Sequence, residues 1–271
     1  MKPPFAYFGG KTRLAEQIAA AFPTHEHYVE PFAGSLAVLL AKPRSRMETV
    51  NDLDGDLMLF WRILRDKPDD FARVCALTPH SRAEHLEAYS LDQAPTDLER
   101  ARRVWVLLTQ GRGGQLRATG WRHFVDPAGS TTSMPGYLEA YVRRMGPAVE
   151  RIAGVSLECQ PALKIIARYG RSPNVLLYVD PPYLGTTRVS GGYRHEMKGE
   201  AEHRELAAAL ADCEAAVVLS GYDSPLYAEM YGGWHVSRID TTTGQGGSRQ
   251  ERTEVLWSNR DTEHTLFGGA A

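Results

Sequence analysis

Short apolar runs alternate with amphipathic segments over both ends of the chain. Runs typical of buried strands occupy residues 27–30, 47–51, 155–159, 175–179 and 215–220. Between these runs, apolar residues recur three and four positions apart, which predicts helices such as the one over residues 201–212. A final alternating segment, residues 253–257, predicts a last strand. Strands that alternate with helices in this way are typical of a doubly wound α/β sheet.

The middle of the chain has a different pattern. From residue 54 to residue 151 the apolar positions follow helical spacing almost throughout, with aromatic residues such as Phe60 and Trp61 on one face. Aromatic stripes of this kind are more often core than contact surface. A long helical segment between strands of a sheet predicts an inserted lobe. We therefore expect a sheet domain formed by residues 1–53 and 152–271, and a helical insertion over residues 54–151.

The strand predicted at residues 175–179 ends at Asp180, Pro181, Pro182 and Tyr183. Asp180 is thereby placed at the carboxyl end of a strand, where open α/β sheets bind ligands. The prolines donate no N–H, so the carbonyls of this stiff turn act as acceptors. A carboxylate, acceptor carbonyls and a flat ring suit a planar molecule that bears an NH2 group, such as adenine. The alternative is a plain strand end with a solvated acid.

A second candidate site lies nearer the start of the chain. The strand at residues 27–30 leads through a glycine turn into a helix, and the next strand, residues 47–51, ends at Asp52. This order is Rossmann-like. A nicotinamide enzyme is the competing interpretation, but the chain has no G-x-G-x-x-G, and Glu30 stands where a pyrophosphate would be repelled. Glu30 would instead attract a cation, and Asp52 is placed to hydrogen-bond ribose hydroxyls.

A third candidate is the stretch over residues 110–124, which is rich in glycine and holds three arginines and no acid. Arg112, Arg117 and Arg122 can contact phosphates or the edge of a guanine, and Trp121 can stack or wedge between bases. This combination favours a loop that binds nucleic acid. A solvated surface loop is the alternative.

Composition limits the function classes. The 271 residues suffice for one large α/β domain or one domain with an inserted lobe, and 43% apolar and 24% charged residues are ordinary for a globular protein. A net charge of −2 gives no overall attraction to nucleic acid, so any such contact needs a local patch. The three cysteines have no C-x-x-C spacing, which disfavours a metal site or disulfides and favours a reducing cytoplasm. No apolar run approaches the roughly 20 residues that span a membrane.

The order of three motifs resembles a known family. Residues 8–11, 30–34 and 180–183 come in the order of the Dam-like (alpha-class) DNA adenine-N6 methyltransferases, and residues 193–197 and 253–257 resemble its phage or prophage members. The resemblance covers nearly the whole chain. It implies a Rossmann-like sheet, S-adenosyl-L-methionine as cofactor, and methyl transfer to adenine N6 in double-stranded DNA, in a restriction-modification or phage setting. It also implies that the helical insertion reads the DNA sequence.

The resemblance implies roles for individual residues. The expected catalytic residues are Asp180, Pro181, Pro182 and Tyr183. The expected cofactor contacts are Tyr7, Phe8, Gly9, Gly10, Lys11, Glu30, Phe32, Gly34, Ser35, Asp52, Gln160 and Asp180. The expected DNA contacts are Arg112, Arg117, Trp121, Arg122, Tyr193, Arg194, His195, Arg249 and Arg252. We further expect a monomer in the bacterial cytoplasm, or in the host cytoplasm for a phage protein.

The chain departs from the family pattern at two positions. Leu36 stands where many members have a second glycine, and Pro161 stands near where related chains carry an acid that holds the cofactor's adenine, so Gln160 is expected to replace that contact.

The alternative functions are a cytosine-N4 DNA methyltransferase, an inactive DNA-binding relative, and a methyltransferase of protein or RNA. The acid at Asp180 favours adenine, because cytosine-N4 enzymes commonly place serine there.

Overall fold

The computed structural model describes residues 1–126, 130, 132–184, 194, 197, 199–243 and 250–261, except for the side chains of residues 240–243 and 250–252. Within these residues, seven strands form one sheet in the order β3-β2-β1-β4-β5-β7-β6. The strands are β1 His27–Glu30, β2 Met47–Asn51, β3 Ser156–Glu158, β4 Val175–Val179, β5 Ala216–Gly221, β6 His235–Thr243 and β7 Gln250–Ser258. Strands β1 to β5 pair in parallel, whereas β7 runs antiparallel to β5 and β6. The predicted α/β, Rossmann-like sheet is thus confirmed.

Helices cover both faces of this sheet, which explains the continuous apolar runs of its central strands. In β4, Leu176 and Tyr178 belong to one apolar core, and Val175, Leu177 and Val179 belong to the other. The first core includes residues of two short helices, α1 Ala15–Ala20 and α2 Ala37–Ala41. The second includes residues of α9 Ala162–Tyr169, α10 Glu200–Ala211 and α11 Pro225–Met230.

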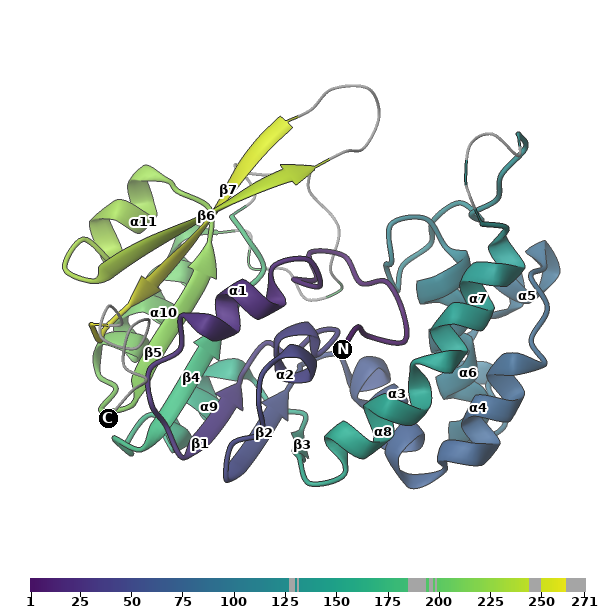
Figure 1. Ribbon diagram of the computed structural model, residues 1–271, viewed down its shortest axis with the longest axis horizontal. Helices are drawn as coiled ribbons and strands as arrows, with labels where there is room; N and C mark the ends of the chain where they lie inside the picture. The colour runs from purple at the N-terminus through teal and green to yellow at the C-terminus, as the bar shows by residue number, and fades with distance from the viewer. Residues whose placement is uncertain are drawn as a thin grey trace, which may run out of the picture.

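The helices between β2 and β3 gather in a lobe to one side of the sheet (Figure 1). They are α3 Gly55–Asp66, α4 Pro68–Ala76, α5 Arg82–Glu87, the 3-10 turn η1 Leu91–Gln93, α6 Asp97–Gln110, α7 Met134–Arg143 and α8 Met145–Ile152. Trp61 and Trp105 are fully buried inside it. These side chains share one continuous apolar core with Leu176 and Tyr178 of the sheet, so the lobe packs on the sheet rather than being joined to it only by the chain.

A buried ion-pair cluster ties the end of the lobe to the edge of the sheet. Glu48 of β2 accepts hydrogen bonds from Lys42, which follows α2, and from Arg151 of α8; Lys42 Nζ and Arg151 Nη2 each lie 2.7 Å from its Oε1. Burial alone would raise the pKa of Glu48, but the hydrogen bonds from Arg151 and Lys42 outweigh it and hold that pKa below its ordinary value. All three side chains are almost fully buried. The carboxylate therefore neutralises two buried cations at once.

We expect Glu48→Gln to lower the free energy of unfolding by about 3–5 kcal/mol, because it leaves two buried cations without a counter-charge. Urea denaturation measures this loss. Glu26→Gln is the matched control: its ion pair with Arg46 is exposed, so its loss should be below about 1 kcal/mol.

The same experiment has a pH dependence with a defined sign. Because the pKa of Glu48 is lower in the folded state, its stabilisation is present above the ordinary carboxyl pKa and is lost as the pH falls through the lowered value. The difference between wild type and Glu48→Gln should therefore shrink only in acid. A difference that stays constant across that range, or equal losses in the two variants, would contradict this account.

Candidate functional site

A cavity of about 280 Å³ lies where the parallel strands end. Its lining includes Glu30 at the end of β1, Asp52 just after β2, and Asp180 just after β4. Because β1, β2 and β4 are parallel, their carboxyl ends meet at one edge of the sheet, and the acids that follow them converge. The sequence therefore folds its scattered acidic positions into one site.

Most of the predicted cofactor residues line this cavity. They are Tyr7, Phe8, Gly9, Gly10, Lys11, Glu30, Phe32, Gly34, Ser35, Asp52 and Asp180. Gln160 lies off the lining: its backbone N–H and C=O bond to the side chain of Asn51, at 2.8 and 3.0 Å. Pro161, Ala162 and Leu163 line the cavity in its place and give it an apolar wall. Among the residues that the structure describes, no His, Cys, Asp or Glu cluster is placed to hold a metal ion.

The glycine turn is held to the neighbouring strand by Asp52. One oxygen of its carboxylate accepts the N–H of Gly34 at 2.9 Å, and the other accepts the N–H of Asp54 at 2.9 Å. Gly34 has φ +49°, and a Cβ atom there would come within 3.0 Å of the Tyr7 ring. Glycine is thus required at this position for both conformation and space.

Leu36, which replaces the second glycine of the family pattern, still adopts the left-handed conformation, with φ 55° and ψ 25°. Its side chain is fully buried in the core shared by the sheet and the lobe. A left-handed leucine costs about 1–2 kcal/mol, which burial of its side chain offsets. The departure in sequence therefore leaves a glycine-like backbone in the turn.

Burial of the acids changes their protonation. Burial raises the pKa of Glu30 well above its usual value, against the hydrogen bond from the Tyr28 hydroxyl at 3.0 Å, and repulsion from Asp180 raises it further. Burial also raises the pKa of Asp180, to about 6; the Lys11 ammonium lowers it and Glu254 raises it. A cavity lined by several acids suits a cationic or neutral ligand and disfavours a phosphate.

Asp180 is held by groups from distant parts of the chain. Lys11 Nζ lies 3.0 Å from Asp180 Oδ1 and 3.3 Å from Glu254 Oε1, and it also hydrogen-bonds the Tyr183 hydroxyl. That hydroxyl lies 3.3 Å from Asp180 Oδ1 and 3.1 Å from Glu254 Oε1. Ser220 Oγ donates to the same Glu254 oxygen at 2.5 Å. Glu254 and Ser220 were not predicted; a charged residue inside the alternating segment 253–257 was the available signal.

The basic stretch folds back on itself beyond α6. Arg112 N–H donates to Gly120 O at 3.0 Å, and Arg122 N–H donates to Gln110 O at 2.7 Å. We call residues 110–122 the basic hairpin. Its Gly114 has φ +61° and accepts a hydrogen bond from the N–H of Phe8 at 2.9 Å, so the hairpin touches the N-terminal segment that lines the cavity.

Trp121 is stacked within the protein. Its ring lies 4.4 Å from that of His80 and 5.1 Å from that of His123, centroid to centroid, with the planes within 18° of parallel. The Arg82 guanidinium lies 4.7 Å from the centre of the same ring. Its indole N–H also points to Gln110 Oε1, at 3.4 Å. The predicted wedge is therefore already engaged with neighbours of its own chain.

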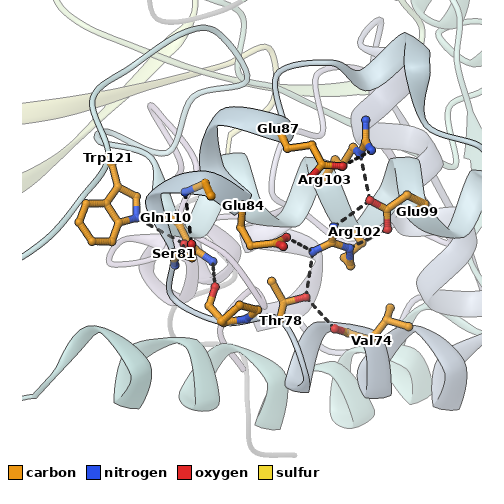
Figure 2. A network of polar contacts seen from close by, with 12 residues as sticks. Val74, Thr78, Ser81, Glu84, Glu87, Glu99, Arg102, Arg103, Gln110 and Trp121 are labelled. Atoms are coloured by element: carbon orange, nitrogen blue, oxygen red, sulfur yellow. Dashed lines mark hydrogen bonds and ion pairs between the residues drawn. The ribbon is translucent and has the colours of Figure 1, made fainter.

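Figure 2 shows how the base of the hairpin is fixed. The Gln110 amide is completely buried; it accepts the N–H of Ser81 at 3.1 Å and donates to Pro79 O at 2.9 Å. Nearer the start of the same helix, Arg102 of α6 hydrogen-bonds Glu84 of α5 at 2.7 Å. The hairpin is thus mounted on a cross-linked pair of helices.

The predicted DNA-contacting arginines differ in their surroundings. Arg112 and Arg117 are exposed on the hairpin, whereas the Arg122 guanidinium lies 4.9 Å from the centre of the Tyr137 ring. Arg194 pairs with Asp56 at 2.5 Å and donates to Leu116 O at 3.0 Å, so it ties α3 to the hairpin. Tyr193, His195 and Arg249 lie outside the described residues, as does the side chain of Arg252.

The chain is similar in sequence to known DNA methyltransferases. A family model described as D12 class N6 adenine-specific DNA methyltransferase matches residues 7–244. The type II methyltransferase M1.LlaDCHI of Lactococcus lactis subsp. cremoris is 25% identical, over 96% of this chain and 95% of that protein. The DNA adenine methylase of Escherichia coli (strain K12) is 25% identical over 92% and 91%. The retron Ec67 DNA adenine methylase of Escherichia coli is 24% identical over 92% and 88%.

The glycine turn yields a test of its left-handed leucine. Leu36→Ala loses the buried side chain and keeps the unfavourable φ, so it should lower the free energy of unfolding by about 2–5 kcal/mol. Leu36→Gly loses the same packing but relieves the φ, and should be more stable than Leu36→Ala by about 1 kcal/mol. Urea denaturation of both variants measures the order, which is the reverse of the usual alanine-over-glycine order. An alanine variant more stable than the glycine variant would contradict the left-handed conformation.

Proposed function

The chain belongs to the D12 class N6 adenine-specific DNA methyltransferase family, and from that premise we propose the role of each part of its site. It is an S-adenosylmethionine-dependent methyltransferase that acts on adenine N6 in DNA. We take the target to be a specific site in double-stranded DNA. The observation that carries the assignment of roles is Asp180, held at the end of β4 beside an acid-lined cavity and followed by two prolines and Tyr183.

The chemistry of the cavity fits the cofactor. S-adenosylmethionine supplies an electrophilic methyl group and carries a sulfonium and an ammonium, both cationic. Glu30 would attract these cations, and a cation bound beside it would in turn favour its charged form. Asp52 would accept hydrogen bonds from the ribose hydroxyls. Each of its carboxylate oxygens already accepts one backbone N–H and can accept a further hydrogen bond. Pro161 and Leu163 would pack on the adenine, whereas Gln160, which was expected to replace the acid that holds the adenine in related chains, lies off the cavity.

Asp180 and the Pro181 carbonyl would each accept one N–H of the target amino group. The N6 lone pair is delocalised into the ring, and both hydrogen bonds favour a more tetrahedral nitrogen whose lone pair is available. The nitrogen would form a bond to the methyl carbon as the methyl–sulfur bond breaks, the sulfur would keep that electron pair, and one N6 proton would be released. With a pKa of about 6, Asp180 is charged at neutral pH and can take up that proton before passing it to water. Positioning supplies most of the rate.

The target base must leave the duplex to reach this site, at a few kcal/mol. Stacking on an aromatic ring, worth roughly 1–3 kcal/mol per base, offsets much of that. Tyr183 is buried, and its hydroxyl is engaged with Asp180 and Glu254. Tyr222 is half-exposed, with its ring centre 4.6 Å from that of Tyr183. We assign Tyr183 to orienting Asp180 as well as to the base, and Tyr222 as a second stacking surface.

The basic hairpin is assigned to DNA binding. The chain as a whole has a net charge of −2, so a local cationic surface has to attract the phosphates. Arg112 and Arg117 are exposed there, on a hairpin that touches the N-terminal wall of the cavity through Phe8. DNA held by these arginines would therefore lie next to the proposed base site.

The proposal also covers the cellular location and the oligomeric state of the enzyme. We place it in the cytoplasm of a bacterium, or of the host if a phage encodes it, acting as a monomer on DNA. The support is the resemblance of residues 193–197 and 253–257 to phage or prophage members of the family. Among the described residues, no helix is long and apolar enough to cross a membrane.

Asp180→Ala should abolish N6-methyladenine formation, and Asp180→Asn should slow it by about a hundredfold or more, because an amide is a weaker acceptor. The test digests treated DNA to nucleosides and identifies them by mass spectrometry. The exposed acid Asp212 provides the control: Asp212→Asn should keep wild-type activity. N4-methylcytosine in the digest, or full activity of Asp180→Ala, would overturn the assignment.

Arg112→Ala and Arg117→Ala should weaken DNA binding on every sequence and reduce the slope of log affinity against log salt by about one each. If one of these arginines reads a base, its replacement would instead relax sequence specificity at one base position. Arg168→Ala, an exposed arginine of α9 outside the hairpin, should leave the slope unchanged. DNA-binding titrations of the three variants across a salt series measure the slopes. Slopes equal to wild type for both hairpin variants would show that the hairpin does not contact phosphates.

A further inference from the structure

Glu254 is a charged side chain in a place where burial is costly. It lies on β7 with 3% of its surface exposed. An isolated carboxylate at such a site is strongly disfavoured unless donors surround it. Its Oε1 atom has three: Ser220 Oγ at 2.5 Å, the Tyr183 hydroxyl at 3.1 Å and Lys11 Nζ at 3.3 Å. The methyl-transfer steps described above do not use it.

Two of these donors are shared with Asp180. Lys11 Nζ and the Tyr183 hydroxyl also lie 3.0 and 3.3 Å from Asp180 Oδ1. The Lys11 ammonium can donate to both carboxylates, and the single hydroxyl hydrogen of Tyr183 can bond to either one. These two groups therefore link the turn after β4 to β7. Any change at Glu254 reaches Asp180 through both groups.

We propose that Glu254 is a positioning residue for methyl transfer, which holds Lys11 and Tyr183 against Asp180 and so fixes the orientation and the charge of the oxygen that accepts the adenine amino group. This rests on the assignment of Asp180 as that acceptor. Lys11 is then part of the acidic cluster rather than a simple cofactor contact. An ammonium beside a cationic cofactor would be repelled, and the two carboxylates neutralise it.

Lys11 and Glu254 act on Asp180 with opposite sign. Burial raises the pKa of Asp180, the Lys11 ammonium lowers it, and Glu254 raises it. Among the described residues, Glu30 from β1, Tyr178 from β4 and Tyr227 from α11 also lie near this cluster, since the charge of Asp180 raises the pKa of each.

Removing Lys11 or Glu254 should therefore shift the pKa of Asp180, in a direction that depends on which of the two is removed. Glu254→Gln should lower the protonation midpoint of Asp180, and Lys11→Met should raise it by about one to three pH units. The double variant Lys11→Met/Glu254→Gln should return most of the way to wild type, because it also removes the repulsion between the two acids. A purely structural role for Glu254 predicts that the second substitution adds to the damage of the first.

Two measurements report these shifts. The acid limb of the pH–rate profile, in single-turnover methyl transfer to DNA, gives the midpoint in the working enzyme. Carboxyl ¹³C NMR of aspartate-labelled protein gives it without cofactor or DNA, with the Asp180 resonance identified by its loss in Asp180→Asn. Glu229→Gln, an exposed acid of α11 paired with Arg204, is the control and should shift neither. Urea denaturation confirms that each variant is folded.

A folded Glu254→Gln with the wild-type midpoint and rate would overturn the proposal, and so would a double variant without rescue. If Glu254→Gln does not fold, Ser220→Ala removes one support of Glu254 and keeps its charge. It should slow transfer several-fold at unchanged affinity for S-adenosylmethionine, and a wild-type rate would count against the proposal. Full activity of Asp180→Asn would instead refute the proposed function, while the NMR midpoints would still decide the link between Glu254 and Asp180.

Discussion

The convergence of carboxylates at one edge of the sheet is the constraint on which the site depends. Strands β1, β2 and β4 are parallel, so Glu30, Asp52 and Asp180 must end at the same edge. Acids that lie close together repel one another, and each has a donor: the Tyr28 hydroxyl for Glu30, the Gly34 N–H for Asp52, and the Lys11 ammonium for Asp180. The donors leave an acidic cavity, which is why its chemistry fits a cationic cofactor.

The helical lobe carries the basic hairpin, to which we assign the binding of DNA. Among the contacts that hold the lobe in place, Arg151 of α8 is bound to Glu48 of β2, and Gly114 of the hairpin accepts the N–H of Phe8. The second contact joins the hairpin to the segment that ends at Lys11. The proposed DNA-binding surface and the proposed acceptor Asp180 are therefore connected through a few residues of the N-terminal segment.

Local patterns predicted the sheet, the helical middle of the chain and the acids at the strand ends, because these follow from periodicity and from the geometry of parallel strands. Side-chain partners were beyond such patterns. Trp121 was expected to stack on bases, but residue 80, distant in sequence, already packs against its ring. Gln160 was expected at the cavity, yet the side chain of Asn51 holds its backbone and brings Pro161 there instead.

The position of Glu254 depends on the antiparallel direction of the last strand, β7. Alternate residues of a strand share a face, and Glu30, Asp180 and Ser220 lie toward the carboxyl ends of the neighbouring strands β1, β4 and β5. In the antiparallel register, Ser220 pairs with Leu256 and Gly221 with Val255. The earlier part of β7 therefore lies at the carboxyl end of β5, with Glu254 within 2.5 Å of Ser220. A parallel β7 would place Glu254 nearer the amino ends of the other strands, away from Asp180. The contacts of Glu254 with Ser220 and with the groups around Asp180 therefore require an antiparallel β7.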